Sequence, residues 1–175
     1  MVQRRQDGSV DFNRTWLEYE DGFGNLAGEF WYGLRALLCL TGQGGWEMRM
    51  DITLSHGRNM FLQYELFKVA STKDKYKLTV ARFQSSSRTF VDPMAAHNGR
   101  YFTTKDRDND VKLDGNCALL HGPTRPSGGW WHRRCWWINP NGLYKNFDGI
   151  RDLSKDKWHT LPFIEIKIRP NNCNI

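Results

Sequence analysis

The segment from Trp46 to Leu54 alternates apolar with charged or polar side chains without a break. Successive side chains of a β-strand point to opposite faces of its sheet, so a period of two predicts a strand with one buried face. The segments Asn59–Val69 and Tyr76–Phe83 repeat this alternation. Three such runs, connected by short polar segments, predict an antiparallel meander.

Two short helices are predicted before the meander. Asn13 is a candidate N-cap for a helix over Arg14–Glu20. A second helix over Phe30–Leu40 would be stopped by the glycines between Gly42 and Gly45. At the other end of the sequence Ile164, Ile166 and Ile168 alternate with other residues, which predicts a strand within 162–170.

The stretch from residue 91 to 161 is rich in Gly, Asn, Asp, Pro and Ser and has few periodic runs. Long irregular segments inside compact domains are usually functional. We therefore expect an α+β fold with an antiparallel central sheet and short helices. Residues 1–90 would form the sheet subdomain, the strand 162–170 would return to it, and residues 91–161 would form a loop-rich subdomain.

Charge and hydropathy exclude some partners. The net charge is +6, from 25 Lys and Arg against 19 Asp and Glu, and the excess is spread over both halves. Such a mild, even excess does not indicate nucleic acid. No apolar run approaches the ~20 residues of a membrane span, so membrane insertion is not expected. Met1–Arg5 lacks the apolar region of a signal peptide, so either an export signal lies upstream or the protein is cytosolic.

Closely spaced aspartates follow Thr104. Asp106, Asp108, Asp110 and Asp114 supply hard oxygen ligands of the kind that Ca²⁺ prefers. An EF-hand is excluded, because the required sixth-position Gly and twelfth-position Glu are both replaced. The residues alone leave two interpretations open, a calcium loop and a solvated acidic turn.

Cys117 and Cys135 enclose a loop that contains His121 and His132. Two cysteines and two histidines could form a zinc site, whereas an oxidising compartment would favour a disulfide. The spacing does not decide between them.

Aromatic and basic residues concentrate in Trp130–Trp137, on both sides of Cys135. Indole faces stack on sugars and bases, and a neighbouring Arg adds cation–π or charged contacts. The competing interpretation is that some of these indoles form the core of the loop-rich part. No catalytic motif is present, so we expect no enzyme.

Motifs along nearly the whole sequence resemble the fibrinogen C-terminal domain family, which includes fibrinogen chains, ficolins, tachylectins and angiopoietin-like proteins. They are Val2–Phe12, Trp16, Tyr19, Gly22–Gly24, Gly28–Trp31, Asp74–Tyr76, His97–Gly99, Thr104–Asp110, Asn116–Ala118, Gly129–Trp131, Cys135, Asn141–Tyr144 and Lys167–Pro170.

The resemblance implies a fibrinogen C-terminal-like fold whose residues 91–161 bind calcium and ligand. It assigns structural Ca²⁺ to the carboxylates of Asp108 and Asp110 and to backbone carbonyls near Lys112 and Asp114. It also implies a disulfide rather than zinc at the cysteine pair described above. In the family, the domain normally begins roughly fifty residues earlier, with a small disulfide-bonded subdomain. This sequence does not include that subdomain.

The family's ligand pocket lies beside that disulfide, where a cis peptide precedes the second cysteine and acetyl groups or a partner peptide bind. The matching cis bond here is Arg134–Cys135, and Trp136 replaces the histidine usual after the cysteine. The resemblance implies ligand contacts from Trp131, Arg134, Cys135, Trp136 and Tyr144.

Two further cysteines, Cys39 and Cys173, are not family cysteines. Cys39 lies on an apolar helix face and is expected to be a buried thiol, whereas Cys173 lies near the end and could bond to another molecule. Asn13-Arg14-Thr15 is a glycosylation sequon, which is usable in a secreted protein.

The resemblance therefore predicts a secreted, calcium-stabilised lectin of the fibrinogen-related type, which binds glycans or glycoproteins on microbial or host cell surfaces. The alternatives are a protein-binding module with a receptor or peptide partner, and a truncated copy that binds nothing. Oligomers in the family form through upstream regions outside this sequence.

Overall fold

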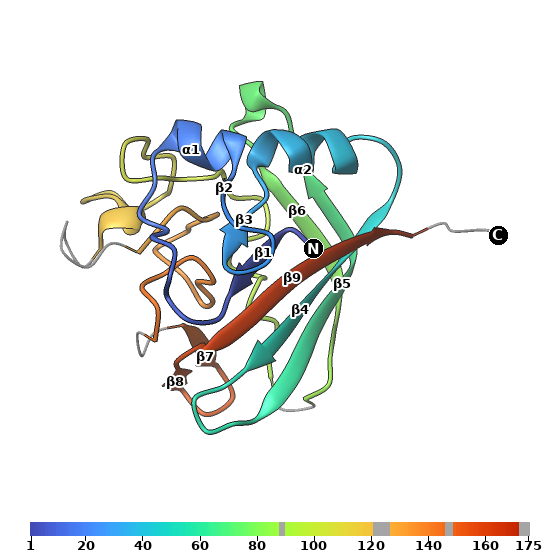
Figure 1. Ribbon diagram of the computed structural model, residues 1–175, viewed down its shortest axis with the longest axis vertical. Helices are drawn as coiled ribbons and strands as arrows, with labels where there is room; N and C mark the ends of the chain where they lie inside the picture. The colour runs from blue at the N-terminus through green and yellow to red at the C-terminus, as the bar shows by residue number, and fades with distance from the viewer. Residues whose placement is uncertain (88–89, 121–126, 146–148, 172–175) are drawn as a thin grey trace.

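The structure, a computed structural model, describes residues 1–87, 90–120, 127–145 and 149–171. Its central element is a seven-stranded sheet in the order β2-β3-β1-β9-β4-β5-β6 (Figure 1). All pairs in it are antiparallel. The strands are β1 Gln3–Arg5, β2 Phe23–Gly24, β3 Phe30–Trp31, β4 Trp46–Thr53, β5 Asn59–Val69, β6 Leu78–Ser85 and β9 Phe163–Pro170.

The last strand lies in the middle of the sheet. β9 pairs with β4 on one side and with β1 on the other, so Ile166 is opposite both Met50 and Gln3. The alternation predicted from sequence is confirmed in β4, β5 and β9, where Met50, Leu62 and Ile166 are buried. Each such residue contributes roughly 1.5–3 kcal/mol when fully buried. The other face of these strands carries charged residues, and there Lys167 bridges Asp51 and Glu165 at 2.9 Å each.

The first helix begins two residues later than predicted. α1 spans Trp16–Asp21, and its N-cap is Thr15 rather than Asn13. The Thr15 side chain accepts the Glu18 N–H at 3.4 Å, and the Glu18 carboxylate accepts the Thr15 N–H at 2.8 Å. This reciprocal capping box satisfies two backbone N–H groups at the start of the helix.

The second helix is also shorter than predicted. α2 spans Leu34–Thr41, because Phe30 and Trp31 instead form β3 and pair with the N-terminal strand β1. Gly33 separates the two elements with φ +104, and a Cβ there would lie 2.9 Å from the carbonyl oxygen of Asp21. A non-glycine residue would be strained in that conformation. α2 packs against α1 and β5.

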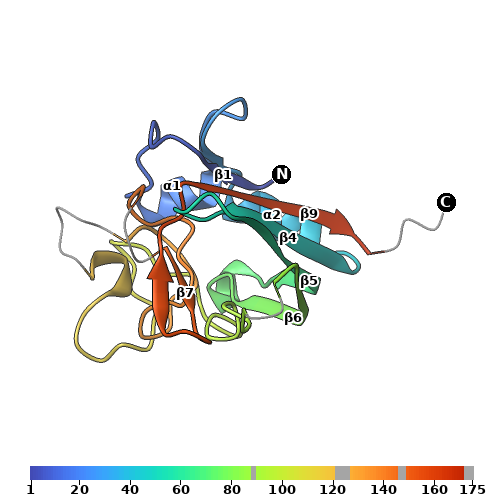
Figure 2. The same ribbon diagram turned by 90° about the horizontal axis from the view of Figure 1, so that it is seen from below.

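The residues between β6 and β9 are largely irregular and lie at the end of the sheet away from the C-terminus (Figures 1 and 2). The remaining described regular elements are two 3₁₀ turns and a hairpin: η1 Thr72–Asp74 before β6, η2 Cys117–Leu119, and the hairpin strands β7 Ile150–Asp152 and β8 Lys157–His159. No helix within the described residues is long and apolar enough to cross a membrane.

An aromatic cluster joins the irregular part to the sheet. Phe102 and Trp131 from the loops meet Trp31 from β3 and Tyr19 from α1, with Phe102 to Trp131 centroids 5.1 Å apart and Phe102 to Tyr19 centroids 5.2 Å apart. All four side chains are almost fully buried. Aromatic pairs at this separation add to the stabilisation from burial, so the loops and the sheet share one core.

Glu29 organises the N-terminal loop from inside the protein. Its buried carboxylate accepts four backbone N–H groups and lies 3.6 Å from the Arg5 guanidinium. Burial opposes ionisation, but the backbone hydrogen bonds and Arg5 hold the pKa of Glu29 below its ordinary value. The N–H donors belong to Gln6, Asp7, Gly8 and Val10.

Candidate functional site

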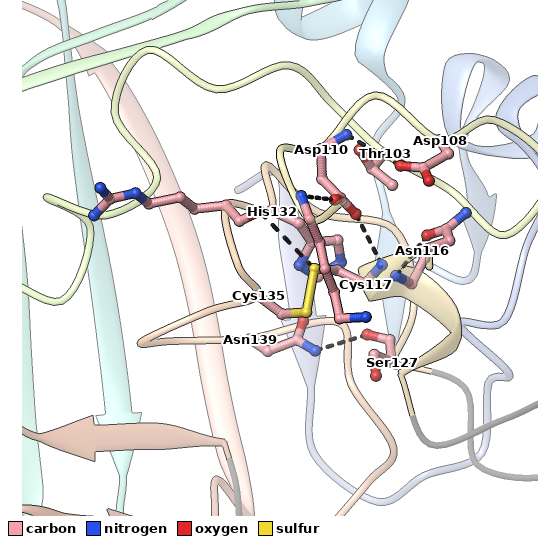
Figure 3. Close-up of a disulfide and its surroundings, with 12 residues drawn as sticks. Thr103, Asp108, Asp110, Asn116, Cys117, Ser127, His132, Cys135 and Asn139 are labelled. Atoms are coloured by element: carbon pink, nitrogen blue, oxygen red, sulfur yellow. Dashed lines mark hydrogen bonds between the residues drawn. A yellow bond between two sulfur atoms is a disulfide. The ribbon is translucent and has the colours of Figure 1, made fainter. Parts of the chain in front are cut away.

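A disulfide joins Cys117 in η2 to Cys135 in the loop that follows Trp131 (Figure 3). The Cα atoms are 5.2 Å apart, and the predicted pairing is confirmed. The zinc alternative is excluded because both sulfurs are bonded to each other. The Nε2 atom of His132 lies 3.1 Å from the carbonyl oxygen of Gly128, and His121 lies outside the described residues.

The peptide bond Arg134–Cys135 is cis, as the resemblance implied. Backbone hydrogen bonds hold this turn in place. The N–H of Arg133 donates to the Cys135 carbonyl at 2.7 Å, and the N–H of Val111 donates to the Arg133 carbonyl at 3.2 Å. The second bond connects the turn to the acidic loop.

His97 forms hydrogen bonds to both ends of the cis-peptide loop, residues 131–138. Its Nδ1 lies 2.8 Å from the Trp131 carbonyl oxygen, and its Nε2 accepts the N–H groups of Trp137 at 3.2 Å and Ile138 at 3.4 Å. These partners assign the proton of the neutral ring to Nδ1. Burial lowers the pKa of His97 to about 4. Sequence reasoning used His97 only as part of a family motif and missed this role.

His132 is a second buried imidazole in the same loop. Its ring lies against the Trp136 ring, with centroids 5.4 Å apart. Burial, followed by repulsion from His97, lowers the pKa of His132 to about 3. Both rings are therefore neutral at pH 7 and act as hydrogen-bonding and packing groups.

The structure corrects the expectation that Trp131 contacts a ligand. Its side chain is 2% exposed, and its indole N–H donates to the Tyr76 carbonyl at 2.7 Å. Trp136 is 9% exposed and packs with Trp158 against the disulfide. A loop-rich segment has few aliphatic side chains, so these indoles supply its core. Only a small part of Trp136 reaches the surface.

The exposed groups of the loop are basic. Arg133 and Arg134 are exposed and Trp137 is half-buried. Within the described residues the Arg134 guanidinium has no ion-pair partner. The remaining predicted contact, Tyr144, packs against the N-terminal loop, and its hydroxyl lies 2.5 Å from the Gln6 carbonyl oxygen and 3.1 Å from that of Pro162.

The acidic loop lies beside the disulfide (Figure 3). The Asp110 carboxylate accepts the N–H groups of Lys112 and Cys117, each at 2.8 Å, and the Asp108 carboxylate accepts the N–H of Asp110 at 3.2 Å. Burial, and to a lesser extent Asp108, raise the pKa of Asp110 despite the hydrogen bonds from Cys117 and Lys112. Two neighbouring carboxylates, one of them with a raised pKa, fit a divalent cation.

Other groups of the acidic loop have different roles. Asp106 accepts the N–H of Trp16 at 2.8 Å and so anchors the start of α1. The Lys112 ammonium contacts the carbonyl oxygen of Asp114 and lies 3.4 Å from its carboxylate. No three His, Cys, Asp or Glu side chains converge as metal ligands within the described parts of the protein. A cation here would therefore need backbone carbonyls and water besides Asp108 and Asp110.

Comparison with known proteins identifies relatives along the whole sequence. Residues 1–171 match the family described as the C-terminal globular domain of fibrinogen beta and gamma chains. Chicken tenascin-R is 38% identical over 98% of this chain and 12% of its own length. Human fibrinogen C domain-containing protein 1 is 40% identical over 97% of this chain and 38% of its own length. Rat fibrinogen-like protein 1 is 37% identical over 98% of this chain and 59% of its own length. The chain thus spans less than two thirds of each relative.

Solved structures agree with these matches. The fibrinogen-like globe domain of human ANGPTL2 aligns with a TM-score of 0.83 and 36% identity, over 98% of this chain and 79% of that one. Lamprey fibrin D-dimer was solved with the peptide ligand Gly-His-Arg-Pro-amide. It aligns with a TM-score of 0.80 and 29% identity, over 99% of this chain and 62% of that one.

Proposed function

Because the chain belongs to the family of fibrinogen beta and gamma C-terminal globular domains, we propose that it is a secreted, non-enzymatic recognition domain that binds its ligand beside Cys135. The strongest support for this proposal is that the cis-peptide loop is held firmly in place. His97 holds both ends of the loop, and the disulfide holds its centre. A preorganised loop loses little conformational entropy when a ligand binds.

The proposed ligand is a glycan, including sugars that carry acetyl groups. Arg134 is exposed and has no described ion-pair partner, so it can donate charge-assisted hydrogen bonds. The accessible edge of Trp136 and the half-buried indole of Trp158 offer apolar surface for a sugar ring. The backbone of Cys135 would supply further polar contacts. Trp131 and Tyr144 would support the site rather than contact the sugar.

We further propose that Ca²⁺ stabilises this loop. The carboxylates of Asp108 and Asp110 would bind it together with the backbone carbonyls of Lys112 and Asp114. The ammonium of Lys112 contacts one of these carbonyls and would have to move aside. Bound calcium would neutralise the two carboxylates and hold the acidic loop against the disulfide loop.

A second candidate is recognition of a protein or peptide, and the lamprey domain solved with a peptide ligand favours it. That peptide is basic. The exposed Arg133 and Arg134 of this protein would instead favour an acidic or neutral peptide.

A glycan array and an acidic-peptide array, each probed with and without calcium, distinguish the two functions. Glycan binding that Arg134→Ala abolishes and Arg82→Ala preserves supports the lectin, because Arg82 is an exposed arginine on the distant strand β6. Peptide binding with the same dependence supports the protein-binding alternative. Absence of binding on both arrays contradicts both proposals and favours a copy that binds nothing.

A further inference from the structure

A second cleft lies beside the β7–β8 hairpin. The turn between β4 and β5, residues 54–58, meets this hairpin and Phe90 around a cavity of about 330 Å³. None of these elements is part of the cis-peptide loop. The lining residues used below are His56, Arg58, Asp152, Lys155, Lys157 and His159.

The hairpin register divides the neighbouring side chains between the two faces of the hairpin, and Trp158 lines the cleft as well as packing against the disulfide. Asp152 is opposite Lys157 and Ile150 is opposite His159, so these side chains share one face, while Arg151 and Trp158 share the other. Trp158 packs toward the disulfide and Trp136. The hairpin therefore directs Lys157 and His159 toward the cleft.

The cleft is strongly basic. Arg58, Lys155 and Lys157 are exposed, and no ion pair within the described residues involves them. Arg58 donates to the Ser87 hydroxyl at 3.0 Å, which orients its guanidinium. The one acid that lines the cavity, Asp152, is buried and accepts the N–H and hydroxyl of Ser154 at 3.1 and 2.6 Å. It offsets only part of the positive charge.

Two histidines complete the lining. The rings of His56 and His159 come from the two different hairpins, and their centroids are 5.5 Å apart. Phe90 lies behind His159, with centroids 6.5 Å apart. The charged groups that face this pair are Arg58, Lys155, Lys157 and Asp152.

We propose that this cleft binds a sulfated glycan and binds it more tightly as the pH falls. Sulfate esters carry full negative charge throughout the physiological range and suit a cluster of lysine, arginine and histidine donors. Several cationic groups around one cavity favour a ligand with more than one anionic group. This inference concerns a site that shares Trp158 with that of the proposed function but has its own cationic side chains.

The pH dependence follows from the histidines. Burial, then repulsion from His56 and Lys157, lowers the pKa of His159, so its ring is neutral at pH 7. A bound anion favours the protonated form, so binding takes up protons and strengthens at lower pH. A phosphate monoester, with its second pKa near 6, loses charge over the same range and would offset this gain. The pH response therefore favours a sulfate.

The test measures binding of a heparin-derived hexasaccharide and of its desulfated counterpart by calorimetry. We expect Lys155→Ala/Lys157→Ala to weaken sulfated binding roughly tenfold, equivalent to about 1.4 kcal/mol, because the variant removes two exposed cations from the cleft. The matched control is Lys68→Ala/Lys73→Ala, which removes two exposed lysines elsewhere. This control variant should bind the sulfated hexasaccharide as tightly as the unaltered protein does. Melting curves of all variants show whether they remain folded.

A second variant tests the histidines. Affinity for the sulfated hexasaccharide should rise about fivefold from pH 7.5 to 5.5, and His56→Gln/His159→Gln should remove this rise while binding at pH 7.5 persists. The proposal is overturned if the desulfated hexasaccharide binds as tightly as the sulfated one. It is also overturned if Lys68→Ala/Lys73→Ala loses as much affinity as Lys155→Ala/Lys157→Ala. A poly-glutamate peptide that binds as tightly as the hexasaccharide overturns the sulfate assignment. Retained binding in Arg134→Ala distinguishes this cleft from the disulfide site.

Discussion

The carboxylate of Asp110 accepts the backbone N–H of Cys117 at 2.8 Å. One hydrogen bond thus connects the acidic loop to the disulfide, and through it to the cis-peptide loop (Figure 3). A change in the charge or position of Asp110 should therefore reach the proposed ligand site. The first two predictions concern this connection.

Calcium should stabilise the folded protein. A ligand present at a hundred times its dissociation constant adds about 2.7 kcal/mol, which raises the melting temperature by roughly 5–10 °C in a domain of this size. We expect EDTA to lower the melting temperature by that amount and Asp108→Ala/Asp110→Ala to abolish the EDTA effect. Asp7→Ala, at an exposed aspartate in the N-terminal loop, is the control. Identical melting curves with and without EDTA would contradict calcium binding.

Removal of the Lys112 ammonium should raise calcium affinity. This cation contacts the Asp114 carbonyl, which is a proposed calcium ligand. Lys112→Met keeps the length of the side chain and removes the competing charge, so we expect about fivefold tighter binding by calorimetry, equivalent to about 1 kcal/mol. Lys145→Met, at an exposed lysine, should have no effect. Equal affinity in both variants would show that Lys112 does not compete.

Acid should destabilise the fold through its two buried histidines. The folded pKa values of about 4 for His97 and about 3 for His132 lie below the ordinary value of 6.5, so the unfolded protein binds more protons between these limits. Their stabilisation is complete above pH 6.5 and is lost as the pH falls. At pH 5 the loss is on the order of 4 kcal/mol.

Urea unfolding at pH 7 and pH 5 measures this loss. His132→Gln should flatten the pH dependence, because it removes one of the two groups. His56→Gln, at an exposed histidine, should change the pH dependence much less than His132→Gln does. A free energy of unfolding that does not change between the two pH values would argue against burial of both rings.

The disulfide should stabilise the fold and Cys39 should not. Closing the loop between Cys117 and Cys135 contributes about 3 kcal/mol through conformational entropy, so Cys117→Ser/Cys135→Ser should lower the free energy of unfolding by about that amount. Cys39 is free and exposed, which corrects the expectation of a buried thiol. In mass spectra after alkylation of the native protein, Cys39 should be labelled, while labelling of Cys117 or Cys135 would contradict the disulfide. Cys173 lies outside the described residues.

The sheet was largely predictable because its signal is local. A strand with one buried face must alternate, so β4, β5 and β9 are visible in the sequence. β1 is not visible, since Gln3–Arg5 is entirely polar. Gln3 and Arg5 are nevertheless buried, because Arg5 meets Glu29 and Gln3 donates to the Pro140 carbonyl at 3.2 Å. Both contacts join distant parts of the sequence.

The candidate site was predictable only through resemblance. The motifs around Cys117 and Cys135 indicated the disulfide and the cis peptide, and both are present. The role of His97 was missed, because a lone histidine gives no sign of which carbonyl or N–H it will meet. The pairing of His56 with His159 was missed for the same reason.

The sequence by itself determined the faces of the central strands, the acidic loop and the membership of a family. Tertiary structure decided which tryptophans are core, where the exposed arginines lie and which charges share a cleft. The physical reason is the range of the interactions. Alternation along a strand is a property of neighbouring residues, whereas burial of Trp136 or convergence of Lys157 and Arg58 depends on segments that only folding brings together.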